Sequence, residues 1–322
     1  MTITYISWAP HCSRSDHTAR ELGGTSHMVY LGWLGSHPLT VGFKYAGQAW
    51  RTWQILRRER PDAIFVMVPP VIGALVVWAY GALHSTPFVM DAHTATFLHP
   101  RWRKWQWLQR AMSRRAATTI VTNEHLANVV RAGGGRATLV PDVPVRFEAI
   151  EPHTRAGEFL VAVVCSFNYD EPVVEMLNAA RELPAVRFLM TGNPKPLSAE
   201  LKANWPANVT LTGFLPDAAY AGLLTSADTV MTLTTRDHTM LRAAYEAIYQ
   251  GTPVIVSDWP LLRSAFDEGA VHVQNTSTAI ADGIRKMEQD HATYRTGAMR
   301  LRERKLERWT ATLGELRAVI AA

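Results

Sequence analysis

Residues 63–92 read AIFVMVPPVIGALVVWAYGALHSTPFVMDA, and the 28 residues from Ala63 to Met90 carry no formal charge. A run of this length exceeds the roughly 20 apolar residues with which a helix spans a bilayer. Pro69 and Pro70 interrupt it, however, because proline removes a backbone donor and excludes a continuous helix. The segment therefore predicts a buried strand, a turn, a buried helix, a second turn and a second strand. Such a unit is typical of a parallel sheet, whose strands are apolar on both faces.

The same alternation continues along the rest of the chain. Before residue 141 it predicts further strands at 2–7, 26–33, 118–122 and 137–141, and helices at 15–22, 44–60, 101–115 and 124–133. After residue 157 it predicts strands at 159–166, 186–192, 208–214, 228–233, 253–258 and 271–274, and helices at 172–184, 218–227, 239–251 and along the charged tail 279–322. Such alternation implies right-handed crossovers and doubly wound sheets. The stretch 141–157 is rich in proline and charge, lacks periodicity and is interpreted as a linker.

We therefore expect two Rossmann-like α/β domains, residues 1–150 and 151–322, with a C-terminal helix that packs back on the first domain. Ligands of such folds bind at the carboxyl ends of the strands, so the expected site is a central cleft that both domains face. Residues 1–152 carry 16 Lys and Arg against 9 Asp and Glu, whereas residues 153–322 carry 17 against 19. The basic first half suggests an anionic partner.

Composition limits the class of protein further. With 322 residues, 48% of them apolar, the chain can bury a large core without disulfides or a structural metal. Cys12 and Cys165 are too few and too distant for a disulfide framework or a four-thiolate zinc site. The opening MTITYISWAP has neither the basic region nor the apolar core of a signal peptide. These observations predict a reduced, cytoplasmic protein.

Several common motifs are absent from the sequence. It has no G-x-G-x-x-G after a strand, no Walker loop, no G-x-S-x-G elbow and no H-E-x-x-H. Gly133, Gly134 and Gly135 follow an expected helix, which is typical of a C-cap turn rather than of a phosphate loop. No Asp-x-Asp pair occurs either. Phosphate chemistry in this protein is therefore expected to use no metal and no other cofactor.

The most informative run is DTVMTLTTRDHTMLRAAYEAIYQGTPVIVSD, residues 228–258. A strand leads through residues 234–238 into a helix that is expected to begin near Thr239 and to stop at Gly251. A helix N-terminus presents free N–H groups and suits a phosphate. Glu246 lies on the second turn among apolar neighbours and needs a hydrogen-bonding partner, and a sugar diol would serve. Alternatively, Glu246 pairs with a nearby arginine or lies on the solvated face of the helix.

Residues 245–258, YEAIYQGTPVIVSD, resemble the signature of the retaining glycosyltransferases of family 4, which have the GT-B fold. VRFLMTGNP at 186–194 and NVTLTGFLPDAAYAGLLTSAD at 208–228 stand where that family has its corresponding strands and turns, and the likeness covers most of 88–275. It implies transfer of a sugar from a nucleotide diphosphate sugar to an acceptor, usually without metal.

The resemblance also implies which residues bind the donor. Glu246 matches the glutamate that binds the ribose hydroxyls. Phe214 and Leu215 match the turn whose backbone reads the base. The other donor-binding candidates are Gly192, Arg236, Thr239 and Met240.

The catalytic candidates are His93, Asp237 and His238. His93, in VMDAHTATF, matches a histidine near the transferred sugar, although a hydrogen-bonded histidine at a strand end fits the residues as well. This sequence has His238 at the position of the family's first glutamate, and Asp237 stands beside it. The chain therefore departs from the family pattern at the residue that usually contacts the donor sugar.

A second departure concerns the diphosphate. The family usually holds it with an Arg and a Lys after the first strand of the second domain, but here that loop reads CSFNYDEPVVE, residues 165–175. Asp170 and Glu171 would repel a diphosphate, so either the loop faces away or the site is rebuilt. Other cations could replace the missing Arg and Lys at the diphosphate, or they could be ordinary surface charges. The five candidates are Arg14, Lys195, Arg236, Arg242 and Arg263.

Residues 99–115, HPRWRKWQWLQRAMSRR, combine six Lys and Arg with three Trp. As one helix they would gather Trp105, Leu108 and Met112 on one side and cations on another. This pattern suits an anionic membrane surface, because Trp favours the interface and each nearby cation adds about 1 kcal/mol. A helix packed on its own domain with a solvated basic face is the alternative. No pattern of a nucleic-acid module accompanies the charge, so nucleic acid is not an expected partner.

These features predict a metal-independent retaining glycosyltransferase that is cytoplasmic, and peripheral on the inner face of the membrane. Its expected partners are a nucleotide-sugar donor and a lipid-linked or polysaccharide acceptor. Two other functions remain open. One is that of a non-catalytic GT-B scaffold or partner subunit, which His238 and the acidic loop favour. The other is that of a nucleotide-sugar epimerase.

Overall fold

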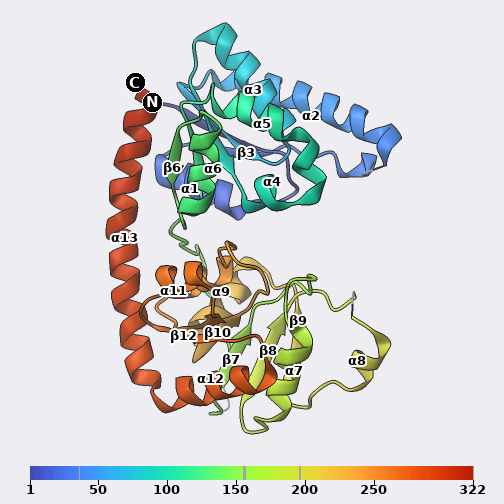
Figure 1. Cartoon of the computed structure of the whole chain (residues 1–322), viewed down its shortest axis with the longest axis vertical. Coiled ribbons are helices and arrows are strands. Elements are labelled where there is room, and N and C mark those ends of the chain that lie inside the picture. The colour runs from blue at the N-terminus through green and yellow to red at the C-terminus, as the bar shows by residue number, and fades with distance from the viewer. Residues whose placement is uncertain (36, 155–156, 196, 322) are drawn as a thin grey trace. The chain divides into compact units, whose positions relative to one another are not determined.

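The computed structural model describes residues 1–35, 37–154, 157–195 and 197–321. The chain divides into two compact units (Figure 1). The first unit comprises Met1–Val143 and Trp309–Ala322, and the second unit comprises Pro144–Arg308. The boundary between them lies inside the stretch 141–157, and the end of the C-terminal helix belongs to the first unit.

The first unit is built on a six-stranded parallel sheet with the order β2-β1-β3-β4-β5-β6. Its strands are β1 (Ile3–Ser7), β2 (Thr25–Met28), β3 (Ala63–Val68), β4 (Phe88–Ala92), β5 (Thr118–Val121) and β6 (Ala137–Leu139). Its helices are α1 (Ser13–Leu22), α2 (Pro38–Glu59), α3 (Val71–His84), α4 (Thr94–Leu98), α5 (Gln106–Ser113) and α6 (Glu124–Ala132), with the 3-10 helices η1 (Gly32–Leu34) and η2 (Pro100–Trp105). The strand order reverses between β1 and β3, and ligands of doubly wound sheets bind at such a point.

Both faces of this sheet are covered, because successive strand residues point to opposite sides. On β3, Val66 faces a core cluster shared with α2, α3 and α5, whereas Phe65 faces one shared with α1 and the end of α13 (His291–Ala321). The strand–helix–strand unit predicted from residues 63–92 is thus confirmed as β3, α3 and β4. Across the described residues, no helix combines the length and the apolar character needed to cross a bilayer.

The second unit repeats the architecture with the strand order β12-β11-β10-β7-β8-β9, all parallel. Its strands are β7 (Leu160–Val163), β8 (Arg187–Thr191), β9 (Val209–Gly213), β10 (Thr229–Thr232), β11 (Val254–Ser257) and β12 (Ala270–Val273). Its helices are α7 (Val173–Arg181), α8 (Ala199–Ala203), α9 (Asp217–Ser226), α10 (Arg242–Tyr249), α11 (Pro260–Ala265), α12 (Ser277–Gln289) and the first part of α13. The order reverses between β7 and β10, so the loops after these two strands flank the expected ligand position.

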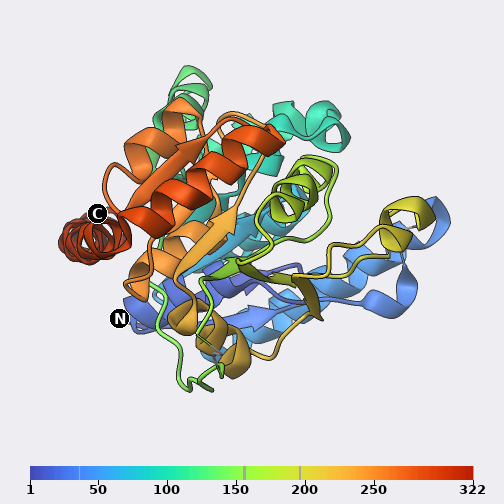
Figure 2. The same cartoon turned by 90° about the horizontal axis from the view of Figure 1, so that it is seen from below.

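Helices cover both faces of the second sheet as well. α7 and α12 pack together on one face (Figure 2). α9, α10, α11 and the first part of α13 share a second core cluster with the other face. The expected class, two doubly wound α/β domains, is confirmed.

Three elements differ from the sequence expectations. The strand expected at 26–33 ends at Met28, because its neighbour β1 ends at Ser7 and offers no further pairing partner. α2 begins at Pro38, before the expected residue 44. The single helix expected at 101–115 is divided into η2 and α5, because the backbone of Trp105 (φ −100°, ψ 4°) leaves the α-helical region.

Candidate active site

The loops after β7 and β10 are joined where the strand order of the second sheet reverses. The N–H of Thr235 donates to the carbonyl of Asp170 at 2.7 Å. Nη1 of Arg236 donates to the hydroxyl of Tyr169 at 2.6 Å, and its guanidinium lies 5.5 Å from the centre of the Tyr169 ring. The acidic loop is therefore held against the β10 loop at this edge of the sheet.

The carboxylate of Glu171 is bound by its own loop. It accepts the N–H groups of Ser166 at 3.0 Å and of Asn168 at 2.7 Å. Phe167 between them has a φ of 58°, a left-handed conformation typical of the concave backbone nests that bind anions. Burial, and then the adjacent Glu171 charge, raise the pKa of Cys165. The negative charge of Glu171 is thus balanced locally by backbone dipoles.

The helix expected to begin near Thr239 begins instead at Arg242, so that prediction is wrong. His238 has a φ of 57°, and a left-handed residue interrupts a right-handed helix. Oδ1 of Asp237 accepts the N–H of His238 at 2.6 Å and closes the turn. Thr239 and Met240 therefore precede the helix, and Met240 packs against the apolar cluster around α10.

The two catalytic candidates in this turn lie side by side. The Nε2 atom of His238 is 3.6 Å from Oδ2 of Asp237, and both side chains are about one third or more exposed, at 43% and 35%. The pair is therefore accessible at the carboxyl edge of β10.

Glu246 lies on the second turn of α10 as predicted, and it is buried, with 2% of its surface exposed. Its Oε2 accepts the hydroxyl of Tyr220 on α9 at 2.7 Å, and its Oε1 accepts Nε of Arg242. Burial and the Glu246 charge raise the pKa of Tyr220, so this tyrosine stays a hydrogen-bond donor. An arginine partner, one of the alternatives left open by the spacing, is thus present. A carboxylate has about four acceptor positions, so two remain for further donors.

The predicted base-reading turn follows β9. Phe214 is 75% exposed, whereas Leu215 is half-buried against the same apolar cluster as Tyr220 and Met240. Gly192, at the end of β8, has a φ of 96°, and a Cβ there would lie 2.2 Å from the carbonyl oxygen of Cys165. Only glycine allows β8 to approach the β7 loop this closely.

The five candidate cations fall into two groups. Arg14, Arg242 and Arg263 pair with Asp91, Glu246 and Asp258 respectively. Arg14 is also buried, at 9% exposure, and its Nη2 donates to the carbonyl of Val140, so its guanidinium is engaged within the first unit. Within the described chain no carboxylate pairs with Arg236 or Lys195. Of these two, Arg236 lies on the β10 loop at the reversal point.

His93 lies at the end of β4, half-buried, and its N–H donates to the carbonyl of Val68 at 2.9 Å. Two residues before it, Asp91 is 1% exposed, accepts the Tyr5 hydroxyl at 2.6 Å and accepts Nε of Arg14 at 3.0 Å. Burial raises the pKa of Asp91, but Arg14, His93 and the Tyr5 hydrogen bond outweigh it and hold the pKa below its usual value. The sequence did not predict this buried network, because its members come from three separate segments.

Residues 99–115 belong partly to the core of the first unit. Leu108 and Met112 are buried against β3 and α3, so they are not available to a membrane. Trp105 and Trp107 remain 40% and 62% exposed. The described residues contain no group of three or more His, Cys, Asp or Glu side chains placed to hold a metal ion.

Comparison with protein families gives two matches. Residues 9–145 match the model of the glycosyl transferase 4-like domain, and residues 172–312 match that of a glycosyl transferase-like domain. No curated protein matches the chain.

Solved structures match over the whole chain. Sucrose-phosphate synthase from Thermosynechococcus elongatus is 17% identical with a TM-score of 0.75, and the match covers 99% of this chain and 98% of that one. HepE from Anabaena in complex with UDP and glucose is 14% identical with a TM-score of 0.71, covering 100% and 99%. A UDP-N-acetylglucosamine 2-epimerase assigned as putative, from Listeria monocytogenes, is 12% identical with a TM-score of 0.60, covering 92% and 90%. At these identities the likeness establishes the fold.

Proposed function

This chain belongs to the glycosyl transferase 4-like family, with the GT-B fold, and we propose that it is a retaining, metal-independent enzyme that transfers a hexose from a UDP-sugar. The choice of uridine rests on the structural neighbours that were solved with UDP or UDP-glucose. The observation that carries the proposal is the buried Glu246 carboxylate, which accepts hydrogen bonds from Tyr220 and Arg242. In the sequence, Glu246 matches the glutamate with which the family binds the ribose hydroxyls.

The donor is proposed to bind along the carboxyl edge of the second sheet. Its ribose hydroxyls donate to the two free acceptor positions of Glu246, and the backbone at Phe214 and Leu215 contacts the uracil. Arg236 contacts the diphosphate, because its guanidinium lies at the β7–β10 reversal and pairs with no carboxylate in the part of the chain that the structure describes. Gly192 keeps the β7 and β8 ends close enough for the diphosphate to lie beside both.

The proposed reaction exchanges one bond at the anomeric carbon for another. The bond from C1 to the diphosphate oxygen breaks, and the acceptor oxygen forms a bond to C1 on the same face of the sugar. The acceptor proton passes to the departing diphosphate. Arg236 stabilises the charge that develops on the leaving group, as preorganised electrostatic groups do. Asp237 with His238 contacts the transferred sugar from the β10 turn.

The acceptor is proposed to be lipid-linked, with the enzyme bound peripherally to an anionic membrane through residues 99–115. Trp105 and Trp107 are exposed there beside Arg101, Arg103 and Lys104, which pair with no carboxylate among the residues described. The exposed indole rings would enter the interface, and the cations would contact lipid phosphates.

Incubation of the protein with UDP-glucose, UDP-galactose and UDP-N-acetylglucosamine tests the function. With a polyprenyl phosphate-linked sugar as acceptor, we expect release of UDP and a new glycosidic bond whose anomeric configuration, read from its proton coupling constant, equals that of the donor. Inversion would reject the retaining mechanism. Conversion of the UDP-sugar without an acceptor would indicate an epimerase, and no binding of any UDP-sugar would indicate a non-catalytic protein.

A further inference from the structure

The first unit carries a helical layer with much positive charge and little exposed negative charge. Helices α2, α3 and α5 pack on one face of its sheet, and α3 contacts both of the others (Figure 1). Residues 30–115 contain 11 Lys and Arg against 3 Asp and Glu. Asp91 is buried, and Glu59 accepts the hydroxyl of Thr4 on β1 at 2.7 Å. Asp62 directly precedes β3 and does not lie on a helix, so the outer surface of this layer is cationic.

Two large aromatic side chains extend from α2 into solvent. Phe43 is 75% exposed and Trp50 is 63% exposed. They are seven residues apart, which places them on the same face of the helix. Arg57, seven residues after Trp50, continues this face, and the exposed Arg51 flanks it. The outer face of α2 thus combines aromatic rings with cations.

A third aromatic ring is held beside this face. Trp33, on η1, is 81% exposed. The segment that carries it is fixed to α2, because Nζ of Lys44 donates to the carbonyl of Gly35 at 3.1 Å. The hydroxyl of Thr40 also donates to the carbonyl of Leu34 at 2.6 Å. Clustered exposed rings of this kind mark an interaction surface.

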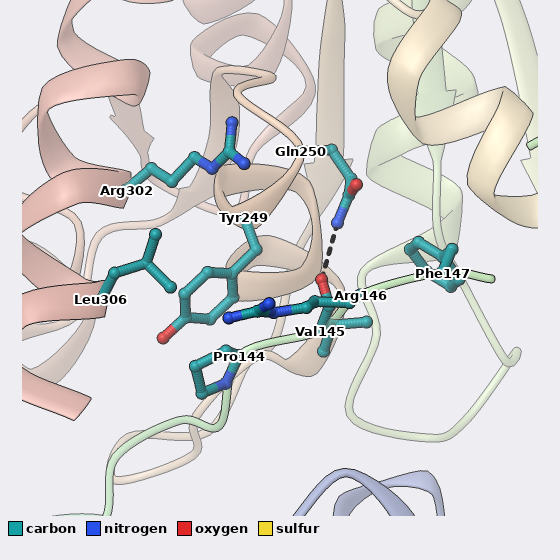
Figure 3. A pocket seen from close by; sticks show the side chains of 8 residues that line it. All are labelled: Pro144, Val145, Arg146, Phe147, Tyr249, Gln250, Arg302 and Leu306. Carbon is teal, nitrogen blue, oxygen red and sulfur yellow. Dashed lines mark hydrogen bonds between the residues drawn. The ribbon is translucent and has the colours of Figure 1, made fainter. Parts of the chain in front are cut away.

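The arginines on α2 differ from one that lines a cavity of the second unit. That cavity, beside the end of α10 and α13, contains Arg146 (Figure 3). Arg146 already has an interaction partner in the protein. Arg51 and Arg57 are exposed and form no ion pair with a carboxylate in the part of the chain that the structure describes. Their charges are therefore available to a partner.

These aromatic and cationic side chains form what we call the α2 surface. Its members are Trp33, Phe43, Trp50, Arg51 and Arg57. Aromatic rings favour the interfacial region of a bilayer, and arginines beside them reach the phosphates of anionic lipids. The α2 surface and residues 99–115 belong to the same helical layer, so one flat anionic surface can contact both.

We propose that the α2 surface binds an anionic lipid bilayer, with its three aromatic rings in the interfacial region and its two arginines on lipid phosphates. The surface shares no residue with 99–115. It extends the membrane contact proposed for that segment, and it rests on that part of the proposed function for the bilayer as the partner. The first unit then contacts the bilayer along its helical layer rather than at η2 and α5 alone.

Sedimentation of the full-length protein with phosphatidylglycerol vesicles measures the affinity. Phe43→Ser/Trp50→Ser should weaken binding at least about tenfold, because two rings no longer leave water. Val174→Ser/Met299→Ser removes two exposed apolar side chains of the second unit and should bind like the wild type. The thermal midpoint of each variant checks its folding. Equal binding by Phe43→Ser/Trp50→Ser and the wild type would overturn the proposal, as would the absence of vesicle binding by the wild type.

A nitroxide label locates the contact without removing both rings. The native cysteines are buried, so labels can be placed singly at Phe43→Cys, Trp107→Cys and Val174→Cys. On vesicles, the label at position 43 should become more accessible to oxygen and less accessible to a water-soluble nickel chelate. The label at position 174 should remain in water.

The labels also separate this proposal from the contact at residues 99–115. A label at position 43 that stays in water would overturn the α2 surface, even if the label at position 107 enters the bilayer. A label that enters at position 43 but not at position 107 would support the α2 surface and reject residues 99–115. Binding of UDP-sugars is measured without vesicles, and its failure would count against the proposed donor site and not against this surface.

Discussion

The hydroxyl of Tyr220 donates to the carboxylate of Glu246, with 2.7 Å between the two oxygens. Arg242, one turn before Glu246 on α10, donates to the other carboxylate oxygen. A buried carboxylate without partners would be strongly destabilising, so the tyrosine and the arginine allow Glu246 to remain charged in the apolar cluster. In the proposed donor complex they also orient it for the ribose hydroxyls.

Tyr220→Phe tests this orienting role, because it removes the hydroxyl and keeps the ring. Loss of a hydrogen bond to a charged group costs about 1.5–3 kcal/mol. Since Arg242 still holds the carboxylate, we expect the low end, roughly a tenfold rise in KM for the UDP-sugar with little change in kcat. Tyr294→Phe, whose ring packs on the opposite face of the second sheet, is the control. An unchanged KM in Tyr220→Phe would show that the hydroxyl serves packing alone.

Arg236→Ala tests the diphosphate contact. We expect the affinity for UDP to fall about 10- to 100-fold, in line with a charge-assisted hydrogen bond, and the affinity for uridine to stay nearly constant. Arg236→Lys should recover only part of the loss, because an ammonium cannot reproduce the planar fork of the guanidinium. Arg263→Ala, which removes an exposed arginine paired with Asp258, should bind UDP normally. Equal losses for UDP and uridine in Arg236→Ala would contradict the assignment.

The sequence predicted the fold well because the relevant signals are local. Prolines within the uncharged run 63–92 separate β3, α3 and β4, and the apolar strands of parallel sheets are recognisable without knowledge of their neighbours. Helix α10 was recognised but its start was not. A left-handed residue at His238 displaces the start to Arg242, and a non-glycine residue gives no local indication of a positive φ.

The partners at the site were less predictable, because they are set by tertiary contacts. Glu246 could be singled out as a polar residue among apolar ones, but Tyr220 comes from α9 and has no fixed spacing to it. In the sequence, the acidic residues of the loop 165–175 argued against a diphosphate site. Its Glu171 is bound by the backbone of its own loop, which no side-chain pattern reveals. Arg14 was a candidate cation from the sequence, but in the structure it is buried and paired with Asp91.

Asp91→Asn should destabilise the first unit. Removing one partner of a buried ion pair leaves the other uncompensated, at a cost of about 3–5 kcal/mol. The native pKa of Asp91 lies below its unfolded value, so its contribution is complete above about pH 4 and is lost as the pH falls through the native pKa. Urea unfolding followed from pH 7 to pH 2.5 should show that the free energy of unfolding falls less with decreasing pH in Asp91→Asn than in the wild type. Asp62→Asn, at an exposed position, should behave like the wild type. An equal loss of unfolding free energy with falling pH in Asp91→Asn and in the wild type would contradict the account.

The double variant Arg103→Glu/Lys104→Glu tests the membrane surface. Each cation near an anionic bilayer contributes about 1 kcal/mol, so the loss of two should weaken binding to phosphatidylglycerol vesicles roughly 30-fold or more at low salt. Trp107→Ala should weaken it further, whereas Val174→Ala, an exposed apolar residue on α7, should not. Vesicle sedimentation measures all three, and binding of the double variant equal to that of the wild type would reject residues 99–115 as the contact.

The central claim is that Glu246 binds the ribose hydroxyls of a UDP-sugar, and a calorimetric cycle with UDP and 2′-deoxy-UDP tests it most directly. We expect the wild type to bind UDP about tenfold or more tightly than 2′-deoxy-UDP, because the deoxy ligand loses a hydrogen bond to a carboxylate. Glu246→Gln, which keeps the side-chain volume, should bind UDP weakly and distinguish the two ligands little. A folded Glu246→Gln that binds UDP as tightly as the wild type, or that keeps the full preference for UDP, would contradict the account.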